Sequence, residues 1–296
     1  LGVLGVVLLV AFAFIERRAK EPLLPLHLFR NRTFSVASAV GFIIGFAMFG
    51  ALTFLPLFFQ VVKGLNPTNS GLQLVPLMAG LLLLSIGSGQ IIARTGRYRV
   101  FPLLGTGLIS LGLFLFSLLN AHTATWEQIV FMVILGAGLG SVMQVLVLIT
   151  QNSVAYSELG VATSGATFFR SIGGSFGAAI FGAIFSNVLA GKLITDLRGV
   201  KLPSGLSGAS ITPAALHQLP EAARHAFVAA YGSSTQVVFL AAVPVGVLAF
   251  VITWFLPNVE LRRGGPAAKA AGSPAVEATA ASPALDPGRT EPEAVR

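Results

Sequence analysis

The sequence predicts an all-α integral membrane protein, and three observations support this prediction. Of the 296 residues, 19 are Lys or Arg and 11 are Asp or Glu, so charged side chains make up 10% of the chain, against roughly 25% in soluble domains. Hydrophobic residues make up 54%, which is more than one compact core of this length can bury. The few charges also leave six long stretches without Asp, Glu, Lys or Arg.

The six uncharged stretches predict six complete transmembrane helices. A helix needs about 20 apolar residues to cross the hydrocarbon core of a bilayer, where an ionised side chain costs several kcal/mol. Each stretch is long enough for one crossing, and together they predict a six-helix bundle over residues 34–257. The expected spans cover residues 34–61, 70–93, 100–119, 128–150, 165–190 and 235–256.

Residues 1–15 are wholly apolar but short for a complete span, and the basic residues that follow them reverse the polarity of a signal peptide. We therefore expect this stretch to be the C-terminal part of a truncated transmembrane helix, with a short N-terminal anchor as the alternative. Residues 16–33, which include five Lys and Arg residues, are expected to form a cytoplasmic linker.

Basic residues in short loops remain on the cytoplasmic side of a membrane, and their numbers here alternate from loop to loop. Lys63 is the single basic residue between the first two complete spans, three arginines lie within 94–99, and none lies within 120–126. Residues 191–234 are therefore expected to form an outer loop that holds an interfacial helical hairpin, or alternatively a substrate-gating lid. Residues 258–296, rich in Ala, Pro and Gly, are expected to form a disordered cytoplasmic tail.

The composition also excludes several classes of function. The chain has no Cys, and its four His are scattered at no metal-ligand spacing, so disulfides, thiolate metal sites and Cys nucleophiles are excluded and no metal site is expected. Neither paired carboxylates nor a nucleophile motif lies at membrane depth, so no enzymatic activity is expected. The net charge of +8 marks membrane topology, which makes lipid rather than nucleic acid the expected partner.

The segment between the second and third spans combines glycines with a basic cluster. Its residues are Gly89, Arg94, Gly96, Arg97 and Arg99. The glycine allows two helices to approach closely, and the arginines can pair with carboxylates or helix C-termini at the membrane edge. A basic turn that only follows the positive-inside rule is the alternative. The spacing resembles the signature of the major facilitator superfamily in its second-half copy, with Ala93 where the family has Asp, and this implies a cytoplasmic latch.

Two further segments resemble drug:proton antiporters with 14 spans, a group within that superfamily. Residues 158–180 resemble the penultimate span of the group, and residues 16–32 resemble the linker that joins its central two-helix insert to its second six-helix bundle. The resemblance implies the six-helix C-terminal bundle of the superfamily plus the end of a preceding helix. The missing N-terminal half of the same transporter would then be a partner.

The same resemblance implies a function, namely the C-terminal half of a proton-coupled multidrug or small-molecule efflux transporter that works by alternating access. Its substrate would be small and hydrophobic or cationic. No cofactor is expected because the proton gradient drives transport, and the location would be a plasma or bacterial inner membrane. Another carrier of the superfamily, for a metabolite or a sugar, is the alternative, and a non-transport membrane protein is a further one.

Glycines spaced four residues apart predict close helix packing. They form the pairs Gly41 and Gly45, Gly136 and Gly140, and Gly173 and Gly177, with Gly165 on the same helix as the last pair. Arg170 lies just inside an expected span, so it must either snorkel to the cytoplasmic interface or pair with a group such as Glu158.

Uncharged polar side chains predict a cavity within the bundle. Gln144, Gln151 and Asn152 follow a 3.6-residue period and so lie along one face of a helix. That face, together with Phe54 and Phe58, is the expected cavity lining. Proton coupling needs a membrane carboxylate whose pKa burial can raise, and no Asp or Glu lies mid-span here. We therefore expect that this chain, expressed alone, does not transport.

Overall fold

The structure is a computed structural model that describes residues 26–196 and 221–257. The expected truncated helix at 1–15, most of the linker at 16–33, the centre of the outer loop and the tail at 258–296 lie outside the described residues. Within the two described ranges the secondary structure is helical and contains no strand.

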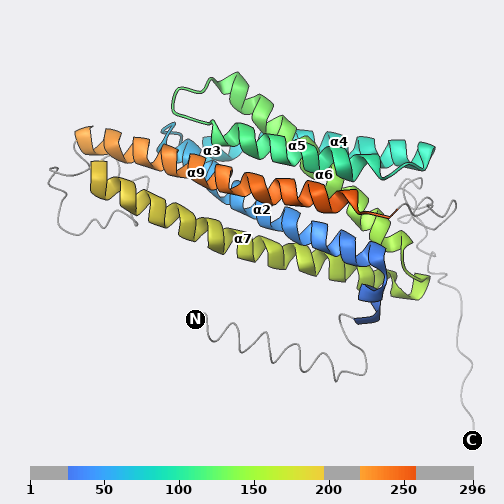
Figure 1. Ribbon diagram of the computed structural model, residues 1–296. Coiled ribbons are helices and arrows are strands. Elements are labelled where there is room, and N and C mark those ends of the chain that lie inside the picture. The colour runs from blue at the N-terminus through green and yellow to red at the C-terminus, as the bar shows by residue number, and fades with distance from the viewer. Residues whose placement is uncertain (1–25, 197–220, 258–296) are drawn as a thin grey trace, which may run out of the picture. The chain divides into compact units, whose positions relative to one another are not determined.

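Successive long helices run in opposite directions and are joined mostly by short turns (Figure 1). Three short elements precede or interrupt them. The elements are η1 (Leu26–Arg30), α2 (Arg32–Val61), α3 (Pro67–Leu72), α4 (Val75–Thr95), α5 (Val100–Ser117), α6 (Thr125–Asn152), η2 (Tyr156–Glu158), α7 (Leu159–Asp196) and α9 (Glu221–Trp254). We call the end of the bundle where α2 ends and α6 begins the Lys63 end, and the opposite end, where α5 begins, the Arg99 end.

The described part of the chain contains six helices that are long and apolar enough to cross a membrane, which confirms the expected fold class. Each of them corresponds to one uncharged stretch of the sequence. The charge gaps predict these helices well because the same cost that keeps ionised side chains out of hydrocarbon also sets where each span begins and ends.

The second expected span differs from the structure because it is divided into α3 and α4. The side chain of Asn66 caps α3 by accepting a hydrogen bond from the Asn69 backbone N–H at 2.7 Å. Pro76, in the first turn of α4, has no N–H of its own, which a helix tolerates in its first turn but not in its interior. The chain therefore stops one helix at Leu72 and starts another at Val75.

The helices α7 and α9 are longer than the sequence pattern predicts, and both continue into the expected outer loop at 191–234. Beyond the main bundle, Leu189 and Leu193 of α7 pack in one apolar cluster with Phe227 and Tyr231 of α9. Apolar burial stabilises a helix more than its intrinsic propensity does, so this contact explains why the helices continue.

Four of the six long helices pack as two matching pairs, with α2 along α7 and α4 along α6. In chain order the helices form two sets of three, namely α2, α4 and α5, followed by α6, α7 and α9. The first helix of each set lies along the second helix of the other set. The third helices, α5 and α9, contact each other, and α9 also contacts α2. In Figure 1 α2, α7 and α9 run side by side.

Glycines bring α2 and α7 into backbone contact. A Cβ atom at Gly45 would overlap the main-chain oxygen of Arg170, and one at Gly173 would overlap the oxygen of Phe42. The other members of this set are Gly177, which contacts Phe46 in the same way, Gly41, where a Cβ would lie 3.9 Å from the Ala166 oxygen, and Gly165, which is buried in α7. Helices this close gain dense van der Waals contact.

The pair α4 and α6 is built in the same way. A Cβ atom at Gly136 would overlap the main-chain oxygen of Leu77, and one at Gly140 would overlap that of Leu81. In both helix pairs the backbones are therefore so close that the glycine hydrogen fits at the contact and a methyl group does not.

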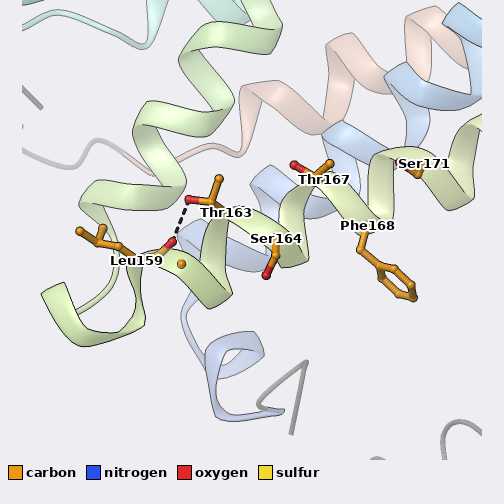
Figure 2. A pocket seen from close by; sticks show the side chains of 7 residues that line it. Leu159, Thr163, Ser164, Thr167, Phe168 and Ser171 are labelled. Carbon is orange, nitrogen blue, oxygen red and sulfur yellow. Dashed lines mark hydrogen bonds between the residues drawn. The ribbon is translucent and has the colours of Figure 1, made fainter. Parts of the chain in front are cut away.

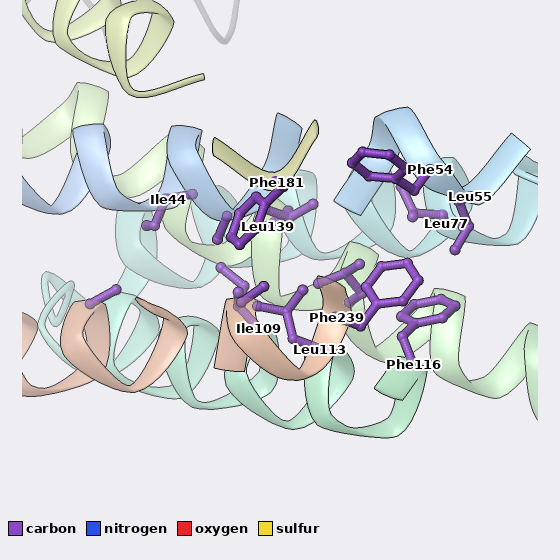
Figure 3. Close-up of a cluster of buried hydrophobic side chains, with 14 of the residues drawn as sticks. Ile44, Phe54, Leu55, Leu77, Ile109, Leu113, Phe116, Leu139, Phe181 and Phe239 are labelled. Atoms are coloured by element: carbon purple, nitrogen blue, oxygen red, sulfur yellow. The ribbon is translucent and has the colours of Figure 1, made fainter. Parts of the chain in front are cut away.

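The core lies among these helices and is rich in aromatic side chains (Figure 3). Phe116 of α5 and Phe239 of α9 stack with ring centroids 5.2 Å apart. On α2, Phe58 is fully buried and the ring of Phe54 lies 5.0 Å from that of Phe185 on α7. These contacts fix α2, α5, α7 and α9 relative to one another.

Candidate functional site

One face of α7 carries small hydroxyl side chains and is not covered by the other described helices. The residues Ser164, Thr167, Ser171 and Ser175 are exposed along it. A hollow of about 700 Å³, here called the α7 hollow, is lined by Leu159, Gly160, Thr163, Ser164, Thr167, Phe168 and Ser171. In Figure 2 Thr163 and Thr167 project from one side of α7, and Ser164 and Phe168 from the other.

The hydroxyl groups of this face are partly satisfied by their own helix. Thr163 Oγ1 donates to the Leu159 main-chain oxygen at 2.8 Å, and Ser164 Oγ donates to that of Val161 at 3.0 Å. A hydroxyl group has two acceptor lone pairs besides its one donor, so each can still accept a hydrogen bond from a bound molecule. The face is thus polar without charge, and Phe168 adds an aromatic surface beside it.

Arg170 lies in a small crevice of about 20 Å³ between α2, α6 and α7, here called the Arg170 crevice. The other residues that line it are Ala37, Gly41, Ile44, Met143, Leu146, Val147, Ala166 and Thr167. Thr167 lines both the crevice and the α7 hollow. Arg170 is half-buried, and its surroundings in the crevice are apolar except for the Thr167 hydroxyl.

The structure does not bring Glu158 to Arg170, so the ion pair that the sequence left open beside snorkelling does not form between these two residues. Glu158 ends η2 before α7 begins, so 12 residues separate the two side chains, a rise of roughly 18 Å along the helix. Among the residues that the structure describes, no carboxylate lies within ion-pair distance of the Arg170 guanidinium and no hydrogen-bond acceptor contacts it.

The polar residues expected to line one face of α6 have different surroundings. Gln144 is exposed, whereas Gln151 Nε2 donates to Thr163 Oγ1 at 3.2 Å and so joins α6 to the α7 hollow. Asn152 Nδ2 donates to the Leu148 main-chain oxygen at 3.1 Å.

The phenylalanines expected to share that cavity lie elsewhere. Phe54 and Phe58 belong to the apolar core and are 5% and 0% exposed. Because almost every residue of α2 is apolar, the sequence pattern does not distinguish its buried side from its free side.

The turn between α4 and α5 donates side-chain hydrogen bonds to the main chain at the C-terminal end of α9. Gly96 adopts a left-handed conformation with a φ of 70°, and its N–H donates to the Ile92 oxygen at 2.8 Å, which ends α4. Arg99 Nη2 then donates to the Trp254 main-chain oxygen at 2.9 Å, and Tyr98 Oη donates to that of Pro257 at 2.8 Å. A cation at the C-terminus of a helix is stabilised by the helix dipole.

The remaining residues of the expected latch are placed differently. Arg94 and Arg97 are exposed. Nothing lies within 4 Å of a Cβ atom built on Gly89, so this glycine does not bring two described helices together. The sequence pattern did not single out Tyr98, whose ring is buried; the signal available in the sequence was an aromatic residue between two arginines at the edge of a span.

At the Lys63 end, an amine that follows α2 and amide groups of α6 and α9 donate hydrogen bonds to the turn between α5 and α6. Lys63 Nζ donates to the main-chain oxygens of Ala121 and Thr123 at 2.8 and 2.9 Å, and burial lowers the pKa of this amine. Gln128 Nε2 also donates to the Thr123 oxygen, at 2.9 Å, and Gln236 Nε2 donates to that of Leu119 at 2.7 Å. The sequence pattern gave Lys63 only a topological role.

The described residues contain no group of three or more His, Asp and Glu side chains that could hold a metal ion. The described helices combine a mainly apolar hollow with a few hydroxyl groups on α7, a cation beside it, and a hydrogen-bonded turn at each end of the bundle.

Comparison with known proteins agrees with this arrangement. The sequence profile of the Major Facilitator Superfamily matches residues 1–178. An uncharacterized MFS-type transporter of Mycobacterium tuberculosis is 44% identical over 250 residues, which cover 84% of this chain and 36% of that protein. The multidrug transporter protein MdtP of Bacillus subtilis is 36% identical over 242 residues, which cover 74% of this chain and 44% of that protein.

The tetracycline resistance determinant of Streptomyces rimosus is 36% identical over 210 residues, which cover 71% of this chain and 60% of that protein. The chain thus spans between 36% and 60% of the length of these three relatives. The family profile covers more than half of the chain, and six helices of membrane-spanning length agree with it. The chain is therefore a multi-pass membrane protein that belongs to the Major Facilitator Superfamily.

Proposed function

We propose that this chain forms part of an efflux transporter that exports small molecules across a membrane by alternating access. The observation that carries the proposal is the α7 hollow. Its volume of about 700 Å³ lies within the range of sites that hold drug-sized ligands. Its exposed hydroxyls and Phe168 suit a mainly hydrophobic molecule with a few hydrogen-bonding groups.

The transporter requires a further part besides this chain. The relatives are longer than the matched segments, and the α7 hollow is walled by one helix alone among those described. The remaining part of the transporter supplies the opposite wall. The tight glycine contacts between α2 and α7 and between α4 and α6 keep this bundle rigid while the two parts rock about the bound substrate.

Transport is coupled to protons, by a carboxylate that lies outside the spans of this chain. In the described helices, the acidic residues Glu127 and Glu221 lie in first turns and Asp196 ends α7. A coupling carboxylate needs a position within the membrane, where burial can raise its pKa. A conformational change can then lower the pKa again, so that the proton is released. The proton gradient therefore acts through the remaining part of the transporter.

The Arg99 end faces the cytoplasm and the Lys63 end faces outwards. Arg94, Arg97 and Arg99 gather in one turn at the first end, whereas Lys63 is the single cation in its turn at the other. The positive-inside rule favours this orientation in a plasma or bacterial inner membrane, and it places the C-terminal tail in the cytoplasm.

An efflux measurement tests the proposal. The chain is expressed together with the remaining part of its transporter in a host that lacks its own efflux pumps, and dye export is followed with and without a proton uncoupler. We expect export that stops when the uncoupler is added. Export that continues contradicts proton coupling, and dye accumulation above the empty host favours an importer of the same superfamily.

Matched variants show whether the α7 hollow carries the function. The double change Thr167→Val and Ser171→Ala removes two hydroxyls from the hollow, and we expect it to weaken export. The change Thr53→Val removes a hydroxyl that is equally exposed but lies on α2, away from the hollow. Equal losses in both variants would contradict a role for the hollow.

A further inference from the structure

Arg170 is a cation at membrane depth without a partner in the described part of the chain. It lies 11 residues after the start of α7, a rise of about 16 Å. Its backbone lies against Gly45, which is close to the middle of α2 (Arg32–Val61). Both helices therefore place Arg170 well inside the bundle, far from either end of α2.

An unpartnered guanidinium at this position is costly. The guanidinium carries five N–H donors, and an apolar environment offers no acceptor in place of the water that these donors lose. Neither a hydrogen-bond acceptor nor a carboxylate of the described residues contacts it. An anion in the crevice would supply the acceptors that these donors lack.

We propose that Arg170 anchors a carboxylate-binding site at the junction of α2, α6 and α7. A planar guanidinium can donate two parallel hydrogen bonds to the two oxygens of a carboxylate, which gives both strength and orientation. The Arg170 crevice, at about 20 Å³, admits a small group and excludes a large one. The side chains of Ala37, Gly41 and Ala166 leave that room because they are small.

The crevice and the α7 hollow are adjacent, since Thr167 lines both. A molecule that places its carboxylate in the crevice can therefore lay its apolar body in the hollow. This juxtaposition narrows the substrate class from any hydrophobic or cationic molecule to one that carries a carboxylate or a similar anionic oxygen pair.

The carboxylate can come from two sources. It can belong to the substrate, an inference that rests on the proposed transport function, or it can be a side chain from the remaining part of the transporter. Both sources use the same chemistry at Arg170, and two binding measurements separate them.

The first measurement uses the 296-residue chain in lipid nanodiscs and two radiolabelled probes of the same size, 1-naphthoate and 1-naphthamide. Saturable binding is followed by a scintillation proximity assay. We expect the carboxylate to bind about tenfold more tightly than the amide, because only the carboxylate can form the bidentate charged pair. We expect the change Arg170→Gln to abolish this preference and Arg170→Lys to retain part of it.

The change Arg224→Gln is the matched control. It removes the same charge from an exposed position of α9 outside the crevice, and we expect it to leave the preference unchanged. Circular dichroism and gel filtration confirm that each variant is folded, and the partial effect of Arg170→Lys keeps the test valid where Arg170→Gln unfolds. Equal binding of the two probes, or a preference that persists in folded Arg170→Gln, would overturn the proposal.

The second measurement repeats the comparison with the remaining part of the transporter present. A carboxylate preference that persists there assigns the site to the substrate, and one that disappears there assigns it to a carboxylate of the transporter itself. Both results support the binding site, which does not require transport to be measured. Loss of efflux activity would therefore contradict the proposed function while leaving this inference intact.

Discussion

The guanidinium of Arg99 donates a hydrogen bond to the main-chain oxygen of Trp254, 2.9 Å away, so the turn after α4 caps the end of α9. We predict that Arg99→Ala lowers the Tm of the chain in detergent by about 3 °C, because the last carbonyls of α9 lose a cationic partner. The change Arg97→Ala removes an exposed arginine two residues away and should leave Tm unchanged. Differential scanning fluorimetry measures both Tm values. Equal shifts would show that the basic turn follows the positive-inside rule without stabilising the end of α9.

The glycine contacts between helices predict a second set of effects. Gly173→Ala would push a methyl group into the Phe42 main-chain oxygen, and Gly136→Ala would do the same at Leu77. Overpacking of this kind costs about 1 to 3 kcal/mol, which unfolding in a denaturing detergent followed by circular dichroism can measure. Gly182→Ala is the control because nothing lies within 4 Å of its Cβ position. Since Ala has a higher helix propensity than Gly, this control should be neutral or stabilising, and a cost as large as that of the other two would contradict the role of the helix contacts.

The sequence predicted the spans well because one physical cost, that of charge in hydrocarbon, decides them. It missed the break before α4, although Pro76 is a recognisable signal for a helix start and Asn66 a recognisable cap. It also assigned Leu193 and Phe227 to a loop, since charged residues such as Lys192 and Arg224 surround them. The packing of α7 against α9 makes this region helical, and no local sequence pattern shows that contact.

The candidate site was harder to predict than the fold. In a span where nearly every residue is apolar, no polar face marks the outside, so Phe54 and Phe58 could not be told from lining residues. The hydroxyls of α7 were visible in the sequence, but their gathering beside Arg170 depends on how α2, α6 and α7 cross. Helix crossing is a property of tertiary packing.

Gln144 offers a test of which exposed face meets water. The chain has no Cys, so single cysteines can be introduced without background. With the remaining part of the transporter present, we predict that Gln144→Cys reacts at least about tenfold faster with a charged, membrane-impermeant thiosulfonate than Leu83→Cys does. Only a hydrated thiol can ionise to the reactive thiolate, and Leu83, 69% exposed on α4, faces lipid in this prediction. Equal rates would place Gln144 against lipid as well.

Lys63 provides the last prediction, because burial lowers the pKa of its amine from the ordinary value of 10.5. The folded chain then holds this proton less tightly than the unfolded chain. Between the two pKa values the unfolded state binds more protons, so the free energy of unfolding should rise with pH in the alkaline range below 10.5. Competitive acetylation of Lys63 at a series of pH values, read by mass spectrometry, should give a deprotonation midpoint below 10.5.

The variant Lys63→Met separates this charge effect from the hydrogen bonds that the amine makes. It removes the titrating group, so the rise in the free energy of unfolding with pH should flatten. It also removes the bonds to the Ala121 and Thr123 oxygens, so stability near neutral pH should fall, since the turn between α5 and α6 loses two hydrogen bonds. Stability that falls while its pH dependence stays unchanged would show that a group other than Lys63 titrates in this range.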